Sequence, residues 1–166
     1  MYFCGLNFCI VGGTGLYIIS FKGLSLGNHL YDWVIDGSFF SMYEMSEISD
    51  AKIDVQLTLM KHSDFLELHF AFCGWVEVSC DRCLEPLKLD ISSEAQMYVK
   101  FDDHAGEEDS EDNDVIILPY DEDRLNVAQY LYEYAHLSIP IRRIHLEDAG
   151  CNPEMIQKLE QYLVKS

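Results

Sequence analysis

Residues 65–101 read FLELHFAFCGWVEVSCDRCLEPLKLDISSEAQMYVKF, and this stretch decides the class of fold. Short runs rich in aromatic and branched side chains, which are typical of strands, recur along it: Phe65–Phe70, Gly74–Val78, Leu87–Ile91 and Ala95–Phe101. The second run leads directly into Cys80 and Cys83. The stretch therefore predicts consecutive strands with a cysteine-bearing turn between them.

The same rhythm extends on both sides of this stretch. Ile53–Leu59 alternates strictly between apolar and polar residues, as a half-buried strand does. Further strands are indicated by the runs Tyr17–Phe21, His29–Ile35 and Val115–Pro119, the second of which ends at an expected Asp36-Gly37 turn. Short strands at regular spacing favour an antiparallel meander or a partial barrel.

Two helices are predicted toward the C-terminus. Apolar residues recur at helical spacing from about Leu125 to Leu137, acidic residues precede them, and Pro140 ends the run. Asn152 can cap a second helix that opens at Pro153. The expected fold class is therefore α+β, a β-rich antiparallel meander or partial barrel followed by two helices.

Charge constrains the partners of this chain. Its 166 residues carry 29 acidic and 11 basic side chains, a formal net charge of −18. Proteins that hold phosphate backbones do so with Lys and Arg, so direct binding to nucleic acid is expected to be weak. Residues 102–114 are the most acidic stretch, and we expect them to form a solvated loop that keeps the protein soluble or docks a basic partner.

The chain is long enough for one domain with a real core. We expect residues 17–166 to form that domain and residues 1–16 to be a peripheral extension. The uncharged start lacks the features of a signal peptide, and glycines dilute it too much for a membrane span. Scattered cysteines in a chain of this size favour reduced thiols and a cytoplasmic location.

The Cys80-x-x-Cys83 motif has two chemical interpretations. Two thiolates at this spacing can hold one zinc ion from a tight turn. The same spacing serves thiol oxidoreductases, where the motif opens a helix. Pro86 and the strand after it argue against a helix here, so the oxidoreductase is the weaker interpretation. Packed thiols without a ligand are the third possibility.

A tetrahedral zinc site needs two further ligands. His145 and Cys151 near the C-terminus can supply them, separated by a polar loop. A site of Cys80, Cys83, His145 and Cys151 would fasten the C-terminal segment to the cysteine turn. The sequence contains none of the familiar hydrolase signatures, and we expect a protein without enzymatic activity.

The string VSCDRCLEP at Val78–Pro86 resembles the signature of the YceD-like family of bacterial and plastid proteins, which is associated with accumulation of large-subunit ribosomal RNA. Its members share this cysteine motif, an acidic loop, and a leucine-rich helix ending in proline, which is similar to Leu125–Pro140 here. Three segments look like those of a Bacteroides-type branch of this family: Ile19–Leu24, Arg142–His145 and Cys151–Pro153. The similarity spans about Tyr17 to Val164. Many relatives carry a second close cysteine pair near the C-terminus, where this chain has only Cys151.

The resemblance implies a role in ribosome biogenesis, in accumulation of large-subunit (23S) ribosomal RNA. Because the chain is so acidic, we expect it to act through a basic protein, either a ribosomal protein or an rRNA-processing factor. A zinc-knuckle adaptor unrelated to ribosomes is the alternative, and a CxxC thiol oxidoreductase is a weaker one. The sequence does not indicate the oligomeric state.

Overall fold

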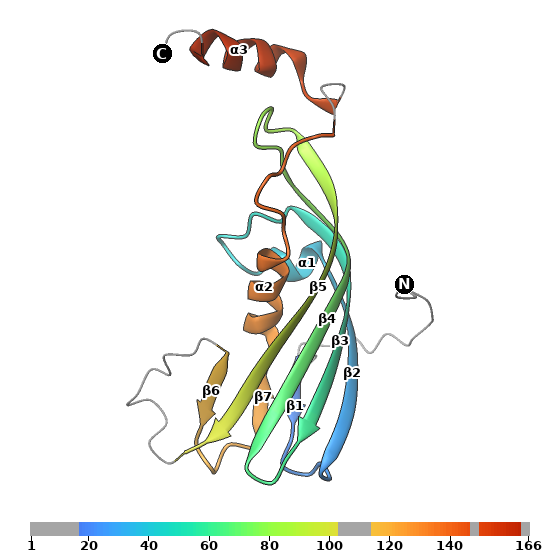
Figure 1. Cartoon of the computed structure of the whole chain (residues 1–166), viewed down its shortest axis with the longest axis vertical. Coiled ribbons are helices and arrows are strands. Elements are labelled where there is room, and N and C mark those ends of the chain that lie inside the picture. The colour runs from blue at the N-terminus through green and yellow to red at the C-terminus, as the bar shows by residue number, and fades with distance from the viewer. Residues whose placement is uncertain (1–16, 103–113, 147–149, 164–166) are drawn as a thin grey trace.

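Five strands form one strongly curved sheet in the order β2-β3-β4-β5-β6 (Figure 1). The structure is a computed structural model, and it describes residues 17–102, 114–146 and 150–163. The strands of the sheet are β2 (Gly27–Asp36), β3 (Asp50–Lys61), β4 (Phe65–Ser79), β5 (Pro86–Phe101) and β6 (Val115–Leu118). Strands β2 to β5 are an antiparallel meander, whereas β6 pairs with β5 in parallel.

The remaining elements lie against or beyond this sheet. They are β1 (Ile18–Ser20), which pairs with β7 (Arg124–Asn126), and the helices α1 (Gly37–Phe40), α2 (Ala128–Leu137) and α3 (Pro153–Leu163). Within the described residues β2 and β6 do not pair, so the sheet stays open as a partial barrel. The α+β fold class predicted from the sequence, with two helices toward the C-terminus, is confirmed.

Strands β4 and β5 are each much longer than the alternating runs predicted. Phe65–Phe70 and Gly74–Val78 belong to one strand of 15 residues, and the two runs that follow belong to one of 16. The gaps left between these predicted runs, residues 71–73 and 92–94, are paired with each other across the two strands. Gly74 is required there because a Cβ at that position would overlap the carbonyl oxygen of Lys52 on β3.

The core lies between the concave face of the sheet and helix α2 with the β1–β7 pair (Figure 1). Alternate residues of β3 point into it, and Ile53, Val55, Leu57 and Leu59 are all buried, as their sequence pattern predicted. From α2, the ring of Tyr134 lies 5.6 Å from that of Phe70 and 6.3 Å from that of Phe72. The helix therefore packs directly against β4.

Two local predictions were wrong. The helix expected from Leu125 begins at Ala128, because Arg124–Asn126 pairs with β1 and Asn126 accepts the amide of Ala128 at 3.0 Å. A helix α1 of four residues follows Asp36, where a turn was expected. The carboxylate of Asp36 accepts the backbone amide of Ser38 at 3.0 Å and so caps that helix.

The predicted N-terminal extension, residues 1–16, lies outside the described residues, and so does most of the acidic stretch, residues 103–113. The proposed single domain over 17–166 stays a prediction. Among the helices that the structure describes, none has the length and apolar character needed to cross a membrane.

Candidate metal centre

The end of the β4–β5 hairpin carries a tight turn with two buried cysteines. The backbone amide of Cys80 donates to the carbonyl of Glu85 at 2.9 Å, and that of Leu84 donates to the carbonyl of Cys80 at 2.9 Å. Leu84 closes the turn in the left-handed region, with φ of 63°. Cys80 and Cys83 are exposed by 0% and 2%, so the turn directs both sulfurs inward.

The C-terminal segment brings two more metal-ligating side chains to this turn. The Nδ1 atom of His145 lies 3.6 Å from the Sγ of Cys83 and 3.6 Å from the Sγ of Cys151. The four ligand atoms of Cys80, Cys83, His145 and Cys151 all lie within 4.8 Å of one another. Tetrahedral zinc with sulfur bonds of about 2.3 Å separates its ligand atoms by about 3.5–3.8 Å, so the cluster has nearly the required size.

The ring of His145 is oriented from its far side. Its Nε2 atom lies 3.3 Å from the carbonyl oxygen of Pro86. A carbonyl only accepts, so Nε2 carries the hydrogen, and Nδ1 of the neutral ring presents its lone pair to the sulfurs. Gly150 packs closely against His145, since a Cβ added at position 150 would lie 2.8 Å from the Cβ of His145.

Charged and backbone groups fasten the segment before His145 to the turn. The amide of Asp81 donates to the carbonyl of Arg143 at 2.7 Å, and the amide of Arg143 donates to the Asp81 carboxylate at 2.9 Å. The guanidinium of Arg143 also pairs with Glu47 at 2.6 Å and with Asp81 at 3.3 Å. Its hydrogen bond to Glu47 is the main cause that raises the pKa of Arg143.

Helix α3 continues the attachment. The side chain of Asn152 accepts the amide of Glu154 at 3.0 Å and donates to the carboxylate of Glu85 at 3.1 Å. Asn152 thus caps α3, as the sequence predicted, and ties it to the cysteine turn. A small apolar cluster surrounds the sulfurs: Leu87, Leu89, Ile144, Met155 and Ile156. Of these, Leu89 also packs against the main core.

The cysteine thiols differ in acidity. Burial raises the pKa of Cys80, but backbone amides of Cys83, Arg82 and His145 point at its sulfur and lower that pKa to about 6. Burial and the neighbouring sulfurs of Cys83 and Cys80 raise the pKa of Cys151 to about 11. Buried thiolates this close repel one another, so all of them ionise together only beside a cation.

The family model described as large ribosomal RNA subunit accumulation protein YceD matches residues 68–162. The chain belongs to the YceD family. No curated protein and no solved structure matches it significantly.

The match places the candidate metal centre inside the part of the chain that resembles other YceD proteins. It begins within β4 at Leu68, and it includes Cys80, Cys83, His145 and Cys151. The structure brings together all four residues that the sequence suggested, and their metal binding stays a prediction. Strands β1 to β3 precede the matched region.

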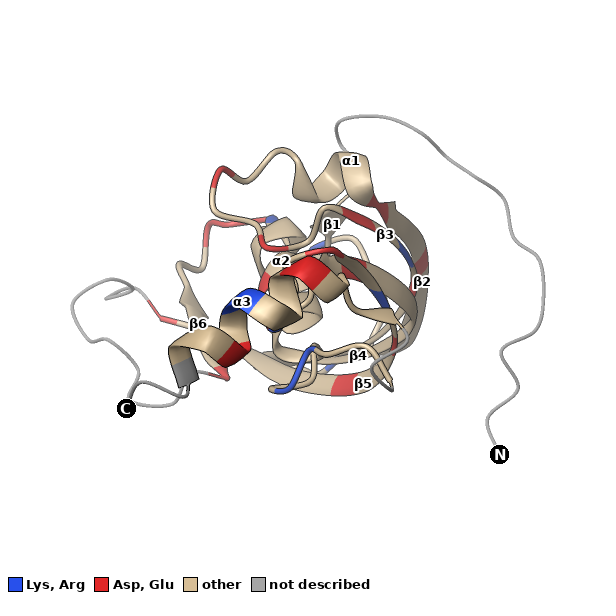
Figure 2. Ribbon diagram, turned by 90° about the horizontal axis from the view of Figure 1, so that it is seen from above, with Lys and Arg blue, Asp and Glu red and all other residues tan. Residues whose placement is uncertain are grey.

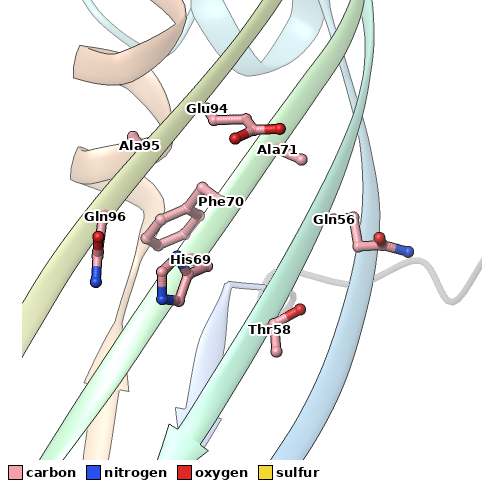
Figure 3. A pocket seen from close by; sticks show the side chains of 8 residues that line it. All are labelled: Gln56, Thr58, His69, Phe70, Ala71, Glu94, Ala95 and Gln96. Atoms are coloured by element: carbon pink, nitrogen blue, oxygen red, sulfur yellow. The ribbon is translucent and has the colours of Figure 1, made fainter. Parts of the chain in front are cut away.

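A second feature of this YceD chain was not predicted from its sequence. A shallow depression of about 390 Å³ lies on the outer face of the sheet around Ala71 (Figure 3). Polar side chains line it, among them Gln56, Thr58 and His69, and the imidazole of His69 is paired with Glu67 at 2.7 Å. The alternation along Ile53–Leu59 placed Gln56 and Thr58 on the polar face of their strand, but no spacing in the sequence marked the depression itself.

Proposed function

We propose that this chain is a non-enzymatic factor in the accumulation of large-subunit ribosomal RNA and acts in the cytoplasm through a basic protein partner. The match of residues 68–162 to the YceD family model is the observation that carries the proposal. That the partner is a basic protein is inferred from the acidic net charge of this chain.

Three features support a protein partner over direct contact with RNA. The formal net charge is −18, and Figure 2 shows acidic residues on β3, β5 and α3. Arg142-Arg143 is the one adjacent basic pair in the sequence. Arg143 is already engaged by Glu47 and Asp81, so it is a poor ligand for phosphate. A basic ribosomal protein or rRNA-processing factor complements this surface.

We propose further that the Cys80, Cys83, His145 and Cys151 cluster holds a structural zinc ion. Its four side chains leave no ligand position for a substrate, as in structural zinc sites. The metal would supply a positive charge for the buried thiolates and fasten α3 to the hairpin. The turn lies between antiparallel strands and not at a helix N-terminus, which disfavours the oxidoreductase alternative.

The proposed role is tested in cells that lack this protein. We expect 23S rRNA to fall relative to 16S rRNA, and expression of the full chain to restore it. An unchanged ratio in cells lacking the protein contradicts the proposal. A restored ratio with a variant that cannot associate with any ribosomal precursor also contradicts it.

A further inference from the structure

Strand β5 has a free edge beside helix α2. Strand β4 pairs with β5 along its whole length, but β6 pairs only with Tyr98–Phe101 on the other side. The amide of Tyr98 donates to the carbonyl of Asp114 at 2.7 Å, so the backbone of Tyr98 faces away from β4. Alternate residues of a strand share this direction, so Gln96 and Glu94 also present their amides and carbonyls away from β4.

No strand in the described part of the chain lies beside these edge groups. Among the described residues, no backbone group is found paired with Glu94 or Gln96 on this side. An unpaired edge is a template for another extended chain. The unpaired amides and carbonyls of this edge can therefore hydrogen-bond to an extended chain, which would lie beside β5 as a further strand.

A groove follows this edge on its inner side. It has a volume of about 350 Å³ and lies between β5 and the C-terminal end of α2. Its walls include Ala95, Tyr134 and Leu137, and Leu137 is 78% exposed. Figure 3 shows Glu94, Ala95 and Gln96 along β5 with α2 behind the strand. A strand placed here would cover the exposed apolar wall with every second side chain.

The acidic residues around the groove favour basic side chains at the remaining positions of that strand. Glu94 and Asp114 line it, and among the described residues no Lys or Arg does. Glu94 is exposed while its neighbours Ser93 and Ala95 are half-buried, so Glu94 faces the outer side of the sheet. Basic residues alternating with apolar ones would meet carboxylate on one side and Leu137 on the other.

We propose that an extended segment of a basic protein, with alternating basic and apolar residues, adds to the sheet as a strand beside β5. The accessible edge at Ser92–Met97 corresponds to about six residues, or about 20 Å of extended chain. The inference rests on the proposed function for its basic partner and specifies where and how that partner binds.

The test uses the full chain and a synthetic peptide of about twelve residues in which Lys and Val alternate, because about six are needed to cover the edge. A peptide with Glu in place of Lys is the control. Fluorescence anisotropy gives the dissociation constant, and amide exchange measured by NMR gives the place of binding. We expect binding of the Lys peptide only, with protection of the amides of Glu94 and Gln96.

Three variants locate the contact. Gln96→Pro removes an edge donor that does not pair with β4, and proline is tolerated at strand edges. Glu94→Lys reverses the charge at the groove, and Asp54→Lys makes the same change on the outer face of β3, away from the groove. We expect the first two to weaken peptide binding by about tenfold or more and the third to leave it nearly unchanged. If Gln96→Pro unfolds the chain, the peptide affinity of Glu94→Lys is compared with that of Asp54→Lys, and this comparison shows whether the peptide binds at the groove.

Several results would overturn the inference. Peptide binding could be weakened equally by Glu94→Lys and Asp54→Lys, or the peptide could protect amides at the edge of β2 in place of those of β5. The Lys peptide could also fail to bind at low salt, or a second copy of the chain could be found to occupy the edge. Co-sedimentation with precursor large subunits separates the two proposals. If the Glu94→Lys chain co-sediments as strongly as the original chain, the groove assignment fails and the ribosomal role stands. If neither chain co-sediments while the peptide binds, the ribosomal role fails.

Discussion

Asp81 and Arg143, 62 positions apart in the sequence, exchange hydrogen bonds in both directions: the amide of Asp81 donates to the Arg143 carbonyl at 2.7 Å, and the amide of Arg143 donates back to the Asp81 carboxylate at 2.9 Å. This reciprocal contact fixes the chain two residues before His145. It therefore positions a candidate metal ligand without touching it.

Replacing Asp81 by Ala is expected to loosen the C-terminal segment. The amide of Arg143 loses its acceptor and the guanidinium loses one of its two carboxylates. The free energy of unfolding should fall by about 1–2 kcal/mol, because the contact is charged but partly solvated. Urea denaturation measures the loss. Asp54→Ala, an exposed carboxylate on β3, is the control, and an equal loss there would contradict the positioning role.

Replacing Cys83 by Ser is expected to remove zinc and stability together. Binding of a structural zinc ion contributes to folding directly, so the loss should exceed about 3 kcal/mol. Metal analysis of protein purified under reducing conditions, followed by thermal unfolding, measures both effects. Cys73→Ser is the matched control, since Cys73 lies on β4 outside the cluster. A Cys83→Ser chain that keeps its metal would argue against the assigned ligands.

Gly150→Ala tests the packing beneath His145. The added Cβ would lie 2.8 Å from the Cβ of His145, so the ring has to move away from the sulfurs. We expect zinc affinity to fall by about tenfold, the scale seen when a ligand loses its orientation. Competition with a chromogenic chelator provides the measurement. Gly23→Ala, which meets no atom within 4 Å, should leave the affinity unchanged.

The cysteines predict a pH dependence for zinc binding. Thiolate is the form that binds metal, and the pKa of Cys80 is lowered to about 6. Affinity should therefore decline more steeply as the pH falls through about 6. Cys151, with a pKa raised to about 11, is protonated at neutral pH, so zinc has to displace its proton. Addition of zinc to a weakly buffered solution should release acid, and no release would contradict Cys151 as a ligand.

The metal-free protein has its own pH dependence. The pKa of Cys80 is lowered on folding from 9.0 to about 6, so the folded state binds its proton less tightly than the unfolded state. The stability contributed by Cys80 is complete above about pH 9 and is lost as the pH falls through about 6. Denaturation in the presence of a chelator, compared with Cys80→Ser, checks the sign. A contribution that grows toward acid pH would contradict it.

The four candidate ligands were visible in the sequence, because two cysteines at this close spacing are a recognisable metal-binding pattern. Two residues separate Cys80 from Cys83, and the C-terminal segment offered His145 and Cys151 as the two further ligands. The supporting contacts were not visible. Nothing in the sequence relates Gly150 to the ring of His145 or Asp81 to Arg143, since these contacts depend on how distant segments meet.

Strand periodicity predicted the sheet but not the lengths of its strands. The predicted runs left residues 71–73 and 92–94 outside the strands. In the sheet these positions face each other and β3, and the pairing carries the strands through. The four residues of α1 are too few to show helical periodicity. The groove beside β5 escaped prediction because the parallel pairing of β6 is set by tertiary structure and not by local sequence.

Co-sedimentation of the purified chain with precursor large ribosomal subunits tests the proposed function most directly. We predict association at low salt that is lost as the salt concentration rises, and no comparable binding to protein-free ribosomal RNA, because an acidic surface is attracted to basic protein and repelled by phosphate. Binding to naked ribosomal RNA that is as tight as binding to the precursor particle would contradict a partner that is a basic protein.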